Sequence, residues 1–338
     1  MTTALLTTPN YQNPIRANMH FPQILHRPVT NEQIIDVEQL AQHQIGKYRR
    51  YIQLQSGDLQ GQLNEVRLDG VVIAREKLNV AMQIYAQPPQ DIVPIAALLS
   101  NTEGMKFCNS QFNYNDLIQA SGSEWQLYTK HNIDYITTIM LRKQLEYHTQ
   151  ILTGETTQKH WFNSLAKPTD PGALYQYKHW LVNLLMLLQN QTELLNRQNI
   201  RRQLSGQVFS LAIKLLATSN KTSIPIERRS RRLAGVKKVI EYLDSYAIEL
   251  PSISDLCVVA CLSERSLEYG FKEHFNLTPH RYAKLIRLNR VRQELYLADS
   301  QYHQVTDVAL KWGFFELGRF AAEYKQLFHE LPSQTLRR

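Results

Sequence analysis

SISDLCVVACLSERSLEYGFKEHF, residues 252–275, and VTDVALKWGFFELGRFAAEYKQLF, residues 305–328, are two versions of one pattern near the end of the chain. Each has a short apolar helical run, a tight turn and a second amphipathic helix, which is the spacing of a helix-turn-helix unit. The second helices match across an offset of about 53 residues, and an internal repeat is a stronger signal than either copy alone. Their matching apolar positions are Leu267, Phe271 and Phe275 in the first copy and Phe320, Tyr324 and Phe328 in the second.

Capping and turn residues set the limits of the helices in this region. Ser263 is a good N-cap for the second helix of the first copy, and Cys261-Leu262 forms the turn before it. In the other copy Thr306 is a candidate cap, and the glycine of Trp312-Gly313-Phe314 suits a left-handed turn position. The predicted helices are Ala234–Tyr246, Ile253–Ala260, Glu264–Phe275, Pro279–Ala298, Val305–Lys311 and Leu317–Phe328.

The helix predicted at Pro279–Ala298 joins the two copies. An apolar stripe that includes Tyr282 and Ile286 marks its inner face. A single rigid helix fixes the separation of the two units, and units on one face of DNA need about one helical turn, roughly 34 Å, between major-groove insertions. Basic residues supply positive charge along this helix: Arg281, Lys284, Arg287, Arg290 and Arg292.

Positive charge is concentrated in the last third of the chain. The 338 residues carry a formal net charge of +8. Residues 228–338 hold 18 Lys and Arg against 13 Asp and Glu, so +5 of that total lies there. Such a distribution fits a surface that binds the phosphates of a nucleic acid.

Residues 31–165 contain many short β-type segments, which favour an antiparallel sandwich or barrel. The clearest pair is Leu59–Arg67 and Val71–Ala74, separated by the hairpin-type turn Asp69-Gly70. Further strands are expected at Gln83–Ala86, Val93–Leu99, Phe107 onward and Trp125–Tyr128, and a helix at Asp134–Gln150.

Two leucine-rich amphipathic helices follow at about residues 172–217. Their apolar stripes could form a helical dimer interface or fill the core of their own domain, and the pattern leaves both open. The fold class is thus α+β. We expect a loose lead-in at 1–30, a β-rich regulatory domain with a helical dimerisation segment at 31–217, a basic linker at 218–232, and an all-α domain of two helix-turn-helix subdomains joined by a long helix at 233–338.

Several short motifs accompany the repeat: Leu256 with Ala260, Leu277-Thr278-Pro279, Val305-Thr306-Asp307-Val308-Ala309, Arg319-Phe320 and Pro332-Ser333. In this combination residues 233–338 resemble the DNA-binding domain of the AraC/XylS family of bacterial transcription regulators. The resemblance implies a sequence-specific regulator, with activator as the expected mode, whose N-terminal domain senses a small molecule. The stretch WGFFELGRFA at 312–321 is also similar to the subgroup that contains the ethanolamine-utilisation regulator.

Carried over by position, the resemblance implies which side chains meet DNA. Base contacts are expected from Arg265, Ser266, Glu268 and Tyr269 in the first recognition helix and from Leu317, Gly318, Arg319 and Ala322 in the second. Phosphate contacts are expected from Ser254, Ser263, Lys272, Arg281, Arg287, Arg290, Thr306 and Lys325. The chain departs from the family where Cys261 replaces a usual glycine and where Phe315-Glu316-Leu317-Gly318 replaces usual polar residues. The second unit is therefore expected to act more through DNA shape and phosphates.

The implied partners are double-stranded DNA, RNA polymerase, a small-molecule effector and a second copy of the chain in a homodimer, in the cytoplasm and without a membrane partner. We expect no cofactor and no metal, because Cys108, Cys257 and Cys261 do not have zinc-site spacing with the isolated histidines. The alternative from another class is a DNA-repair or DNA-modifying enzyme with a helix-turn-helix module. That alternative lacks the Pro-Cys-His-Arg nucleophile it needs, so we expect a protein that is not an enzyme.

Overall fold

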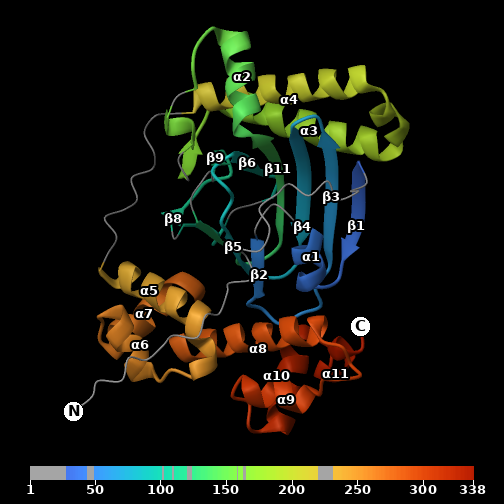
Figure 1. Ribbon diagram of the computed structural model, residues 1–338. Coiled ribbons are helices and arrows are strands. Elements are labelled where there is room, and N and C mark those ends of the chain that lie inside the picture. Colours follow the sequence, from blue (N-terminus) through green and yellow to red (C-terminus); the bar gives the residue numbers. More distant parts are fainter. Residues whose placement is uncertain are drawn as a thin grey trace, which may run out of the picture.

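The computed structural model describes residues 28–43, 49–100, 103–108, 110–119, 124–157, 159–162, 165–219 and 231–338. Most of the expected lead-in and linker lies outside these residues. Within them, two antiparallel sheets face one another, with strand orders β1-β3-β4-β11-β6-β9-β12 and β2-β5-β10-β7-β8 (Figure 1). The strands are β1 Val29–Ile34, β2 Arg49–Gln53, β3 Gly61–Leu68, β4 Val71–Leu78, β5 Met82–Ala86, β6 Ile92–Leu98, β7 Lys106–Phe107, β8 Ser110–Gln111, β9 Asp116–Gln119, β10 Trp125–Tyr128, β11 Ile133–Leu141 and β12 Leu165–Pro168.

Of the two expected architectures, a sandwich or a barrel, the structure has two separate sheets as in a sandwich, and the first expected hairpin is confirmed. Strands β3 and β4 pair in antiparallel register from Gly61 opposite Leu78 to Leu68 opposite Val71. Gly70 in the connecting turn has φ of 79°, a left-handed conformation that glycine adopts without steric cost. The turn dipeptide therefore sets the register of the two strands.

The helix expected at Asp134–Gln150 is wrong in its first half. Residues Ile133–Leu141 form β11, and the helix α2 covers only Arg142–Thr153. The strand contains Ile136, Thr137 and Thr138, whose β-branched side chains favour an extended backbone. It lies between β4 and β6 and pairs with both, so tertiary pairing determines its conformation.

Two long helices, α3 Pro171–Asn190 and α4 Gln198–Thr218, cover the outer face of the larger sheet (Figure 1). Leu181 and Leu185 of α3 and Phe209 of α4 pack in one core with Val66 and Ile73 of the sheet. Of the two interpretations left open, packing within the domain accounts for these apolar side chains. The outer side of α3 keeps Tyr175 and Met186 exposed.

The C-terminal helices lie where the caps and turns predict them. They are α5 Arg231–Tyr246, α6 Ile253–Ala260, α7 Glu264–Phe275, α8 Pro279–Leu297, α9 Val305–Lys311, α10 Leu317–Phe328 and α11 Pro332–Leu336. The other helices are α1 Val37–His43 and the short 3-10 helices Lys159–Phe162, Thr192–Asn196 and Ala247–Glu249. None of the helices in the described ranges combines the length and apolarity that a membrane span requires.

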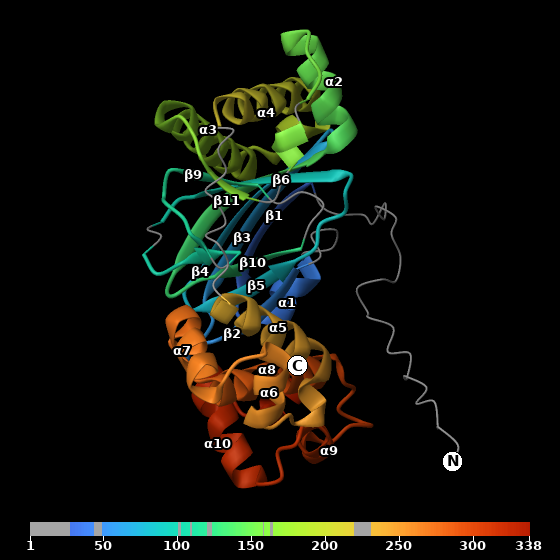
Figure 2. The same cartoon turned by 90° about the vertical axis from the view of Figure 1, so that its left-hand side faces the viewer.

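Four layers follow one another along the molecule: the pair α3 and α4, the larger sheet, the smaller sheet and the C-terminal helices (Figure 2). Both faces of the smaller sheet pack against other parts of the structure. Its inner side chains, such as Met82 and Ile84, pack against the larger sheet. Its outer side chains, such as Ile52 and Tyr85, join the core of the C-terminal domain. The outer face of the smaller sheet and the C-terminal helices therefore share one apolar cluster, which is distinct from the cluster between the two sheets.

Polar contacts fix how α8 lies on the smaller sheet. Gln53 N donates to Asn289 Oδ1 at 2.9 Å, and Asn289 Nδ2 donates back to Gln53 O at 3.0 Å. The Arg292 guanidinium binds Asp36 at 2.5 Å, and both side chains are about 95% or more buried. Such reciprocal buried contacts are satisfied in only one relative position of the two domains.

The turn between α6 and α7 contains a backbone conformation that suits glycine better than cysteine. Cys261 has φ of 53° and ψ of 42°, and its side chain is exposed. We predict that Cys261→Gly stabilises the protein by about 0.5–1 kcal/mol, since a left-handed L-residue costs about 1–2 kcal/mol and glycine's extra entropy offsets part of that gain. Chemical denaturation measures the change. Cys261→Ala keeps the Cβ and should give no comparable gain; an equal gain would contradict the backbone argument.

Candidate nucleic-acid interface

Side-chain caps hold the first helix pair, α6 and α7. The Ser252 hydroxyl accepts from Asp255 N at 3.2 Å, and Ser252 N donates to the Asp255 carboxylate at 2.8 Å, which is a capping box. The expected cap at Ser263 is confirmed, because its hydroxyl accepts from Ser266 N at 3.4 Å. These caps satisfy N–H groups in the first turns of α6 and α7 and define where each helix begins.

The second helix pair, α9 and α10, depends on its turn. Gly313 has φ of 75°, as expected, and a Cβ built there would lie 2.3 Å from Leu250. Glycine is thus required both by the backbone and by the approach of the neighbouring loop. The expected cap at Thr306 is wrong: the N-cap position of α9 is Gln304, and its side chain makes no capping bond.

The two recognition helices lie on the same side of the domain. In Figure 2, α7 and α10 are both to the left of α8, whereas α9 lies to the right and α6 overlaps α8. Each helix pair packs on α8, so this one helix determines how far apart α7 and α10 are. The arrangement presents two helices to one face of a duplex.

The side chains expected to meet DNA bases lie at the surface of α7 and α10. Ser266 is half-buried and the other seven are exposed: Arg265, Glu268, Tyr269, Leu317, Gly318, Arg319 and Ala322. The Arg265 guanidinium lies 5.8 Å from the centre of the Tyr269 ring, which holds both side chains on one edge of α7. Their roles in DNA contact stay predictions.

The side chains expected to meet phosphates fall into two groups. Six are exposed: Ser254, Ser263, Lys272, Arg281, Thr306 and Lys325. Arg287 and Arg290 are half-buried, and burial lowers the pKa of both. Arg290 binds Asp244 at 2.9 Å, and Arg287 donates to Trp312 O at 3.4 Å. In this arrangement these two arginines bind groups of their own chain.

Contacts from the smaller sheet also reach the ends of both recognition helices. Lys106 Nζ donates to Glu273 O at 2.7 Å, near the end of α7. Gln53 Nε2 donates to Leu327 O at 3.0 Å, near the end of α10. Sequence reasoning missed these contacts, because they join residues more than 150 positions apart and no local pattern marks them.

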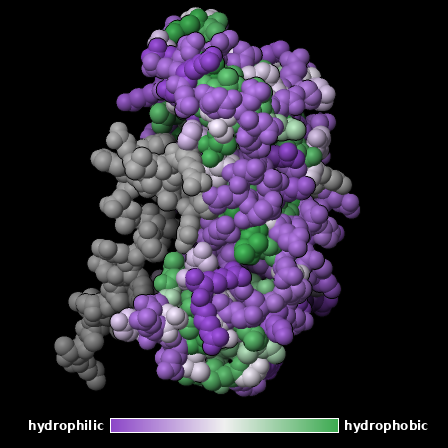
Figure 3. Space-filling view, turned by 90° about the vertical axis from the view of Figure 1, so that its right-hand side faces the viewer, coloured by the Kyte–Doolittle hydropathy of each residue, from purple (hydrophilic) through white to green (hydrophobic). Residues whose placement is uncertain are grey.

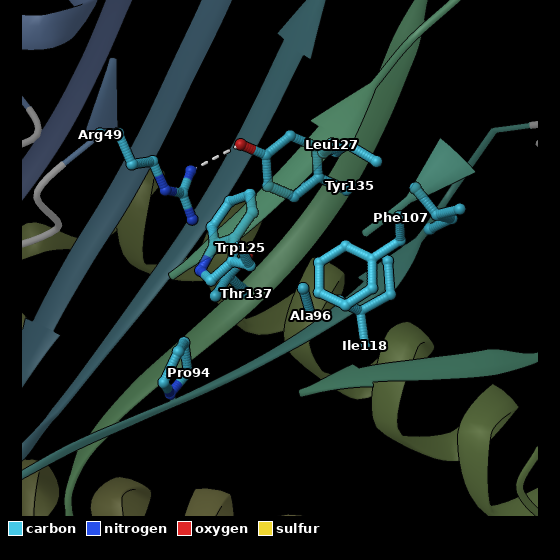
Figure 4. A pocket seen from close by; sticks show the side chains of 10 residues that line it. Arg49, Pro94, Ala96, Phe107, Ile118, Trp125, Leu127, Tyr135 and Thr137 are labelled. Atoms are coloured by element: carbon cyan, nitrogen blue, oxygen red, sulfur yellow. Dashed lines mark hydrogen bonds between the residues drawn. The ribbon is translucent and has the colours of Figure 1, made fainter. Parts of the chain in front are cut away.

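A small cavity lies between the two sheets (Figure 4). Its volume is about 30 Å³, and its walls are mostly apolar and aromatic, with Phe107, Trp125 and Tyr135 among them. Arg49 at one side binds Glu76 at 2.5 Å and the Tyr135 hydroxyl at 2.6 Å. Two wall residues keep polar atoms without a hydrogen-bond partner in the described part of the chain, Trp125 Nε1 and Thr137 Oγ1. Buried donors of this kind favour a bound acceptor.

Comparison with known proteins identifies the C-terminal part of the chain. Residues 256–338 match the model of a family described as a helix-turn-helix domain. A probable thc operon regulatory protein from Rhodococcus erythropolis is 38% identical over 102 residues, which are 30% of this chain and 31% of that protein. The XylDLEGF operon transcriptional activator 3 from Pseudomonas putida is 28% identical over 195 residues, which are 56% of each chain.

A solved structure covers the same region. A probable AraC family transcriptional regulator from Rhodopseudomonas palustris is 31% identical, with a TM-score of 0.29, over 31% of this chain and 95% of that one. This chain spans about a third and just over half of the length of the two curated relatives. The described residues contain no group of three His, Cys, Asp or Glu side chains placed to hold a metal ion.

Proposed function

We propose that this chain, whose residues 256–338 form a helix-turn-helix domain of the AraC type, binds specific DNA sequences and regulates transcription. The observation that carries the proposal is the repeated helix pair, α6–α7 and α9–α10, with both second helices on one side of α8. Two such helices on one rigid connection can enter successive major grooves of a duplex. The name of the Pseudomonas putida relative supports activation as the direction of control.

Affinity and specificity come from different residues in this proposal. Exposed Lys272, Arg281 and Lys325 contact phosphates and give affinity without sequence preference, together with the hydroxyls of Ser254, Ser263 and Thr306 in or beside the first turns of their helices. Arg287 and Arg290 join them only after their contacts with Trp312 and Asp244 open. Arg265 reads guanine and Glu268 accepts from cytosine, because these pairings match the major-groove edges of those bases.

The cavity between the sheets is the effector site in this proposal. Trp125 offers an N–H and Thr137 a hydroxyl, and Glu76 compensates the charge of Arg49. A small, planar, uncharged molecule with a carbonyl acceptor suits these groups. A cavity of about 150 Å³ accommodates benzene. This one has about 30 Å³, so a ring-sized ligand must push the two sheets apart.

The smaller sheet couples the cavity to the DNA-binding domain. Side chains of a strand alternate between its two faces. Arg49 lines the cavity, and Arg50 next to it binds Asp244 of α5. In the same way Phe107 lines the cavity, and Lys106 binds the end of α7. A ligand that displaces this sheet changes how α7 and α10 are presented to DNA.

We further propose that the chain works as a cytoplasmic homodimer that recruits RNA polymerase to DNA. Support for the dimer is an exposed stripe on α3, where Tyr175, His179 and Met186 share one face with half-buried Val182. Membership of the subgroup that contains the ethanolamine-utilisation regulator is also part of the proposal, on the stretch 312–321.

Selection from a random duplex library tests the DNA-binding proposal. We expect the full chain to enrich a site with two half-sites about one helical turn apart. Arg265→Ala should lower affinity for that site by roughly 5- to 150-fold, the equivalent of about 1–3 kcal/mol, and leave binding to unrelated DNA almost unchanged. Arg202→Ala, an exposed arginine of α4, is the matched control. Failure to enrich any sequence would sink the proposed function, and an equal loss on all DNA would exclude base reading by Arg265.

Benzaldehyde and benzamide, which are planar and carry one carbonyl, test the effector site. Binding to the native chain should raise its melting temperature and change its affinity for the selected DNA. Trp125→Phe keeps an aromatic side chain, although a smaller one, removes the indole N–H and should weaken ligand binding up to about tenfold. Trp161→Phe is the control, since the Trp161 N–H is also buried without a partner in the described residues but lies outside the cavity. Equal behaviour of the two variants would contradict this site.

Sedimentation velocity tests the proposed dimer. Met186→Glu places a charge in the middle of the α3 stripe and should shift the chain toward monomer, because a buried unpaired carboxylate opposes association. Ile151→Glu, a change at an equally exposed apolar residue of α2, should have no such effect. A native chain that sediments as a monomer at all accessible concentrations, with and without DNA, would refute the dimer.

A further inference from the structure

The exposed surface at the start of α10 is apolar, although it belongs to the proposed DNA-reading helix. Phe315 is 71% exposed and Leu317 is 37% exposed. Gly318 and Ala322, one turn apart on the same helix, are also exposed, and a Cβ at Gly318 would meet no atom within 4 Å. The surface therefore combines an aromatic side chain, an aliphatic side chain and open space beside them.

The one cation in this first turn is engaged by neighbouring carboxylates. Arg319 Nε donates to Glu323 at 3.1 Å, and Arg319 lies 3.8 Å from Glu316. Glu323 also accepts from Lys284 of α8 at 3.0 Å. The carboxylates of Glu316 and Glu323 thus balance the positive charges of Arg319 and Lys284 at this end of α10. A bidentate contact from Arg319 to guanine requires that Arg319 break its hydrogen bond with Glu323.

Among the bases, only thymine presents a methyl group in the major groove. Apolar side chains recognise thymine through that methyl group, whereas the other base edges need hydrogen-bonding partners. Residues at the N-terminal end of a recognition helix are the ones that reach base edges. Phe315 lies directly before Glu316, the N-cap of α10, so it is close to the position from which a base edge can be touched.

We propose that α10 recognises its half-site through the 5-methyl groups of thymines, which Phe315 and Leu317 contact. This proposal rests on the proposed DNA-binding function and assigns different chemistry to the two recognition helices. Helix α7, with Arg265 and Glu268, reads hydrogen-bonding edges of G·C pairs. Helix α10 reads methyl groups, so its half-site is rich in A·T pairs and the operator is chemically asymmetric.

The surroundings of Phe315 favour DNA over a second protein as the occupant of this surface. Lys325 lies two turns along the same exposed side of α10, where it can reach a phosphate. Figure 3 shows hydrophobic atoms at the lower end of the molecule, where Figure 1 has α9 and α10, among a largely hydrophilic surface. An apolar surface at the start of α10 with Lys325 beside it matches the floor of a DNA groove with phosphates at its edge.

Deoxyuridine substitution tests the proposal, because it removes the methyl group of thymine and keeps base pairing. The site selected by the full chain is synthesised with each dT of the α10 half-site replaced in turn by dU, and affinity is measured by fluorescence anisotropy. For each contacted methyl we expect about a fourfold loss with the native chain, the effect of one buried methyl group. Phe315→Ala should bind the dT and dU versions equally at the thymine that Phe315 contacts and keep the loss where Leu317 makes the contact, which makes a double-mutant cycle.

Two controls separate the outcomes. Val258→Ala alters an apolar residue of α6 that is 77% exposed, and it should keep the full response to dU. Substitutions in the α7 half-site should be neutral for the native chain. The proposal is overturned if the native chain binds all dU sites as it binds dT sites, or if Phe315→Ala keeps the full loss at every position. A selected bipartite site would then still support the DNA-binding function. If selection enriches no site, both proposals fall together.

Discussion

One helix, α8, packs against three parts of the structure: the first helix pair, the second helix pair and the smaller β-sheet. Its side chains Tyr282, Asn289 and Arg292 are buried and polar, so each needs a specific partner. Tyr282 and Tyr85 share a hydrogen bond of 3.0 Å between their hydroxyls, Asn289 pairs with the backbone of Gln53, and Arg292 pairs with Asp36. Removing one partner from a buried ion pair costs roughly 3–5 kcal/mol, whereas the intact pair contributes little net stability. These contacts therefore determine the position of α8 more than they stabilise the folded protein.

That balance matters for the proposed coupling between the β-rich part of the chain and the C-terminal helices. An interface held by apolar area alone tolerates small shifts, since the hydrophobic effect has no preferred direction. The interface here also contains hydrogen bonds and ion pairs, which a displacement of the smaller sheet breaks together. Arg50 and Arg290 converge on the same Asp244, so even a shift of one strand changes the pairing of a side chain on α8. These contacts therefore hold the smaller sheet in one defined position relative to α8.

Local signals predicted the C-terminal helices well and the interface poorly. Ser263, Cys261 and Gly313 mark helix ends through caps and left-handed turns, and such signals act over a few residues. β11 was missed because it runs directly into α2 without a glycine or proline between them. The pairing of Gln53 with Asn289 joins positions far apart in the chain, yet a sign of it exists in the sequence. Asn289 and Arg292 lie on the same helical stripe as Tyr282 and Leu285, and polar residues on an apolar stripe indicate buried partners.

Ion pairs within the chain also reduce the positive charge that is available for binding DNA. Sequence composition assigns +5 to residues 228–338, but several of those cations form ion pairs with carboxylates of the same chain. Arg292 and Arg338 bind Asp36 of the N-terminal domain, and Lys311 binds Glu294 of α8. Helix α7 itself carries Glu264, Glu268 and Glu273 beside Arg265 and Lys272, so its own charge is slightly negative. In the proposed complex we therefore expect modest phosphate attraction at this face, and complementarity to base edges, hydrogen-bonded at α7 and apolar at α10, to supply a larger share of the binding free energy.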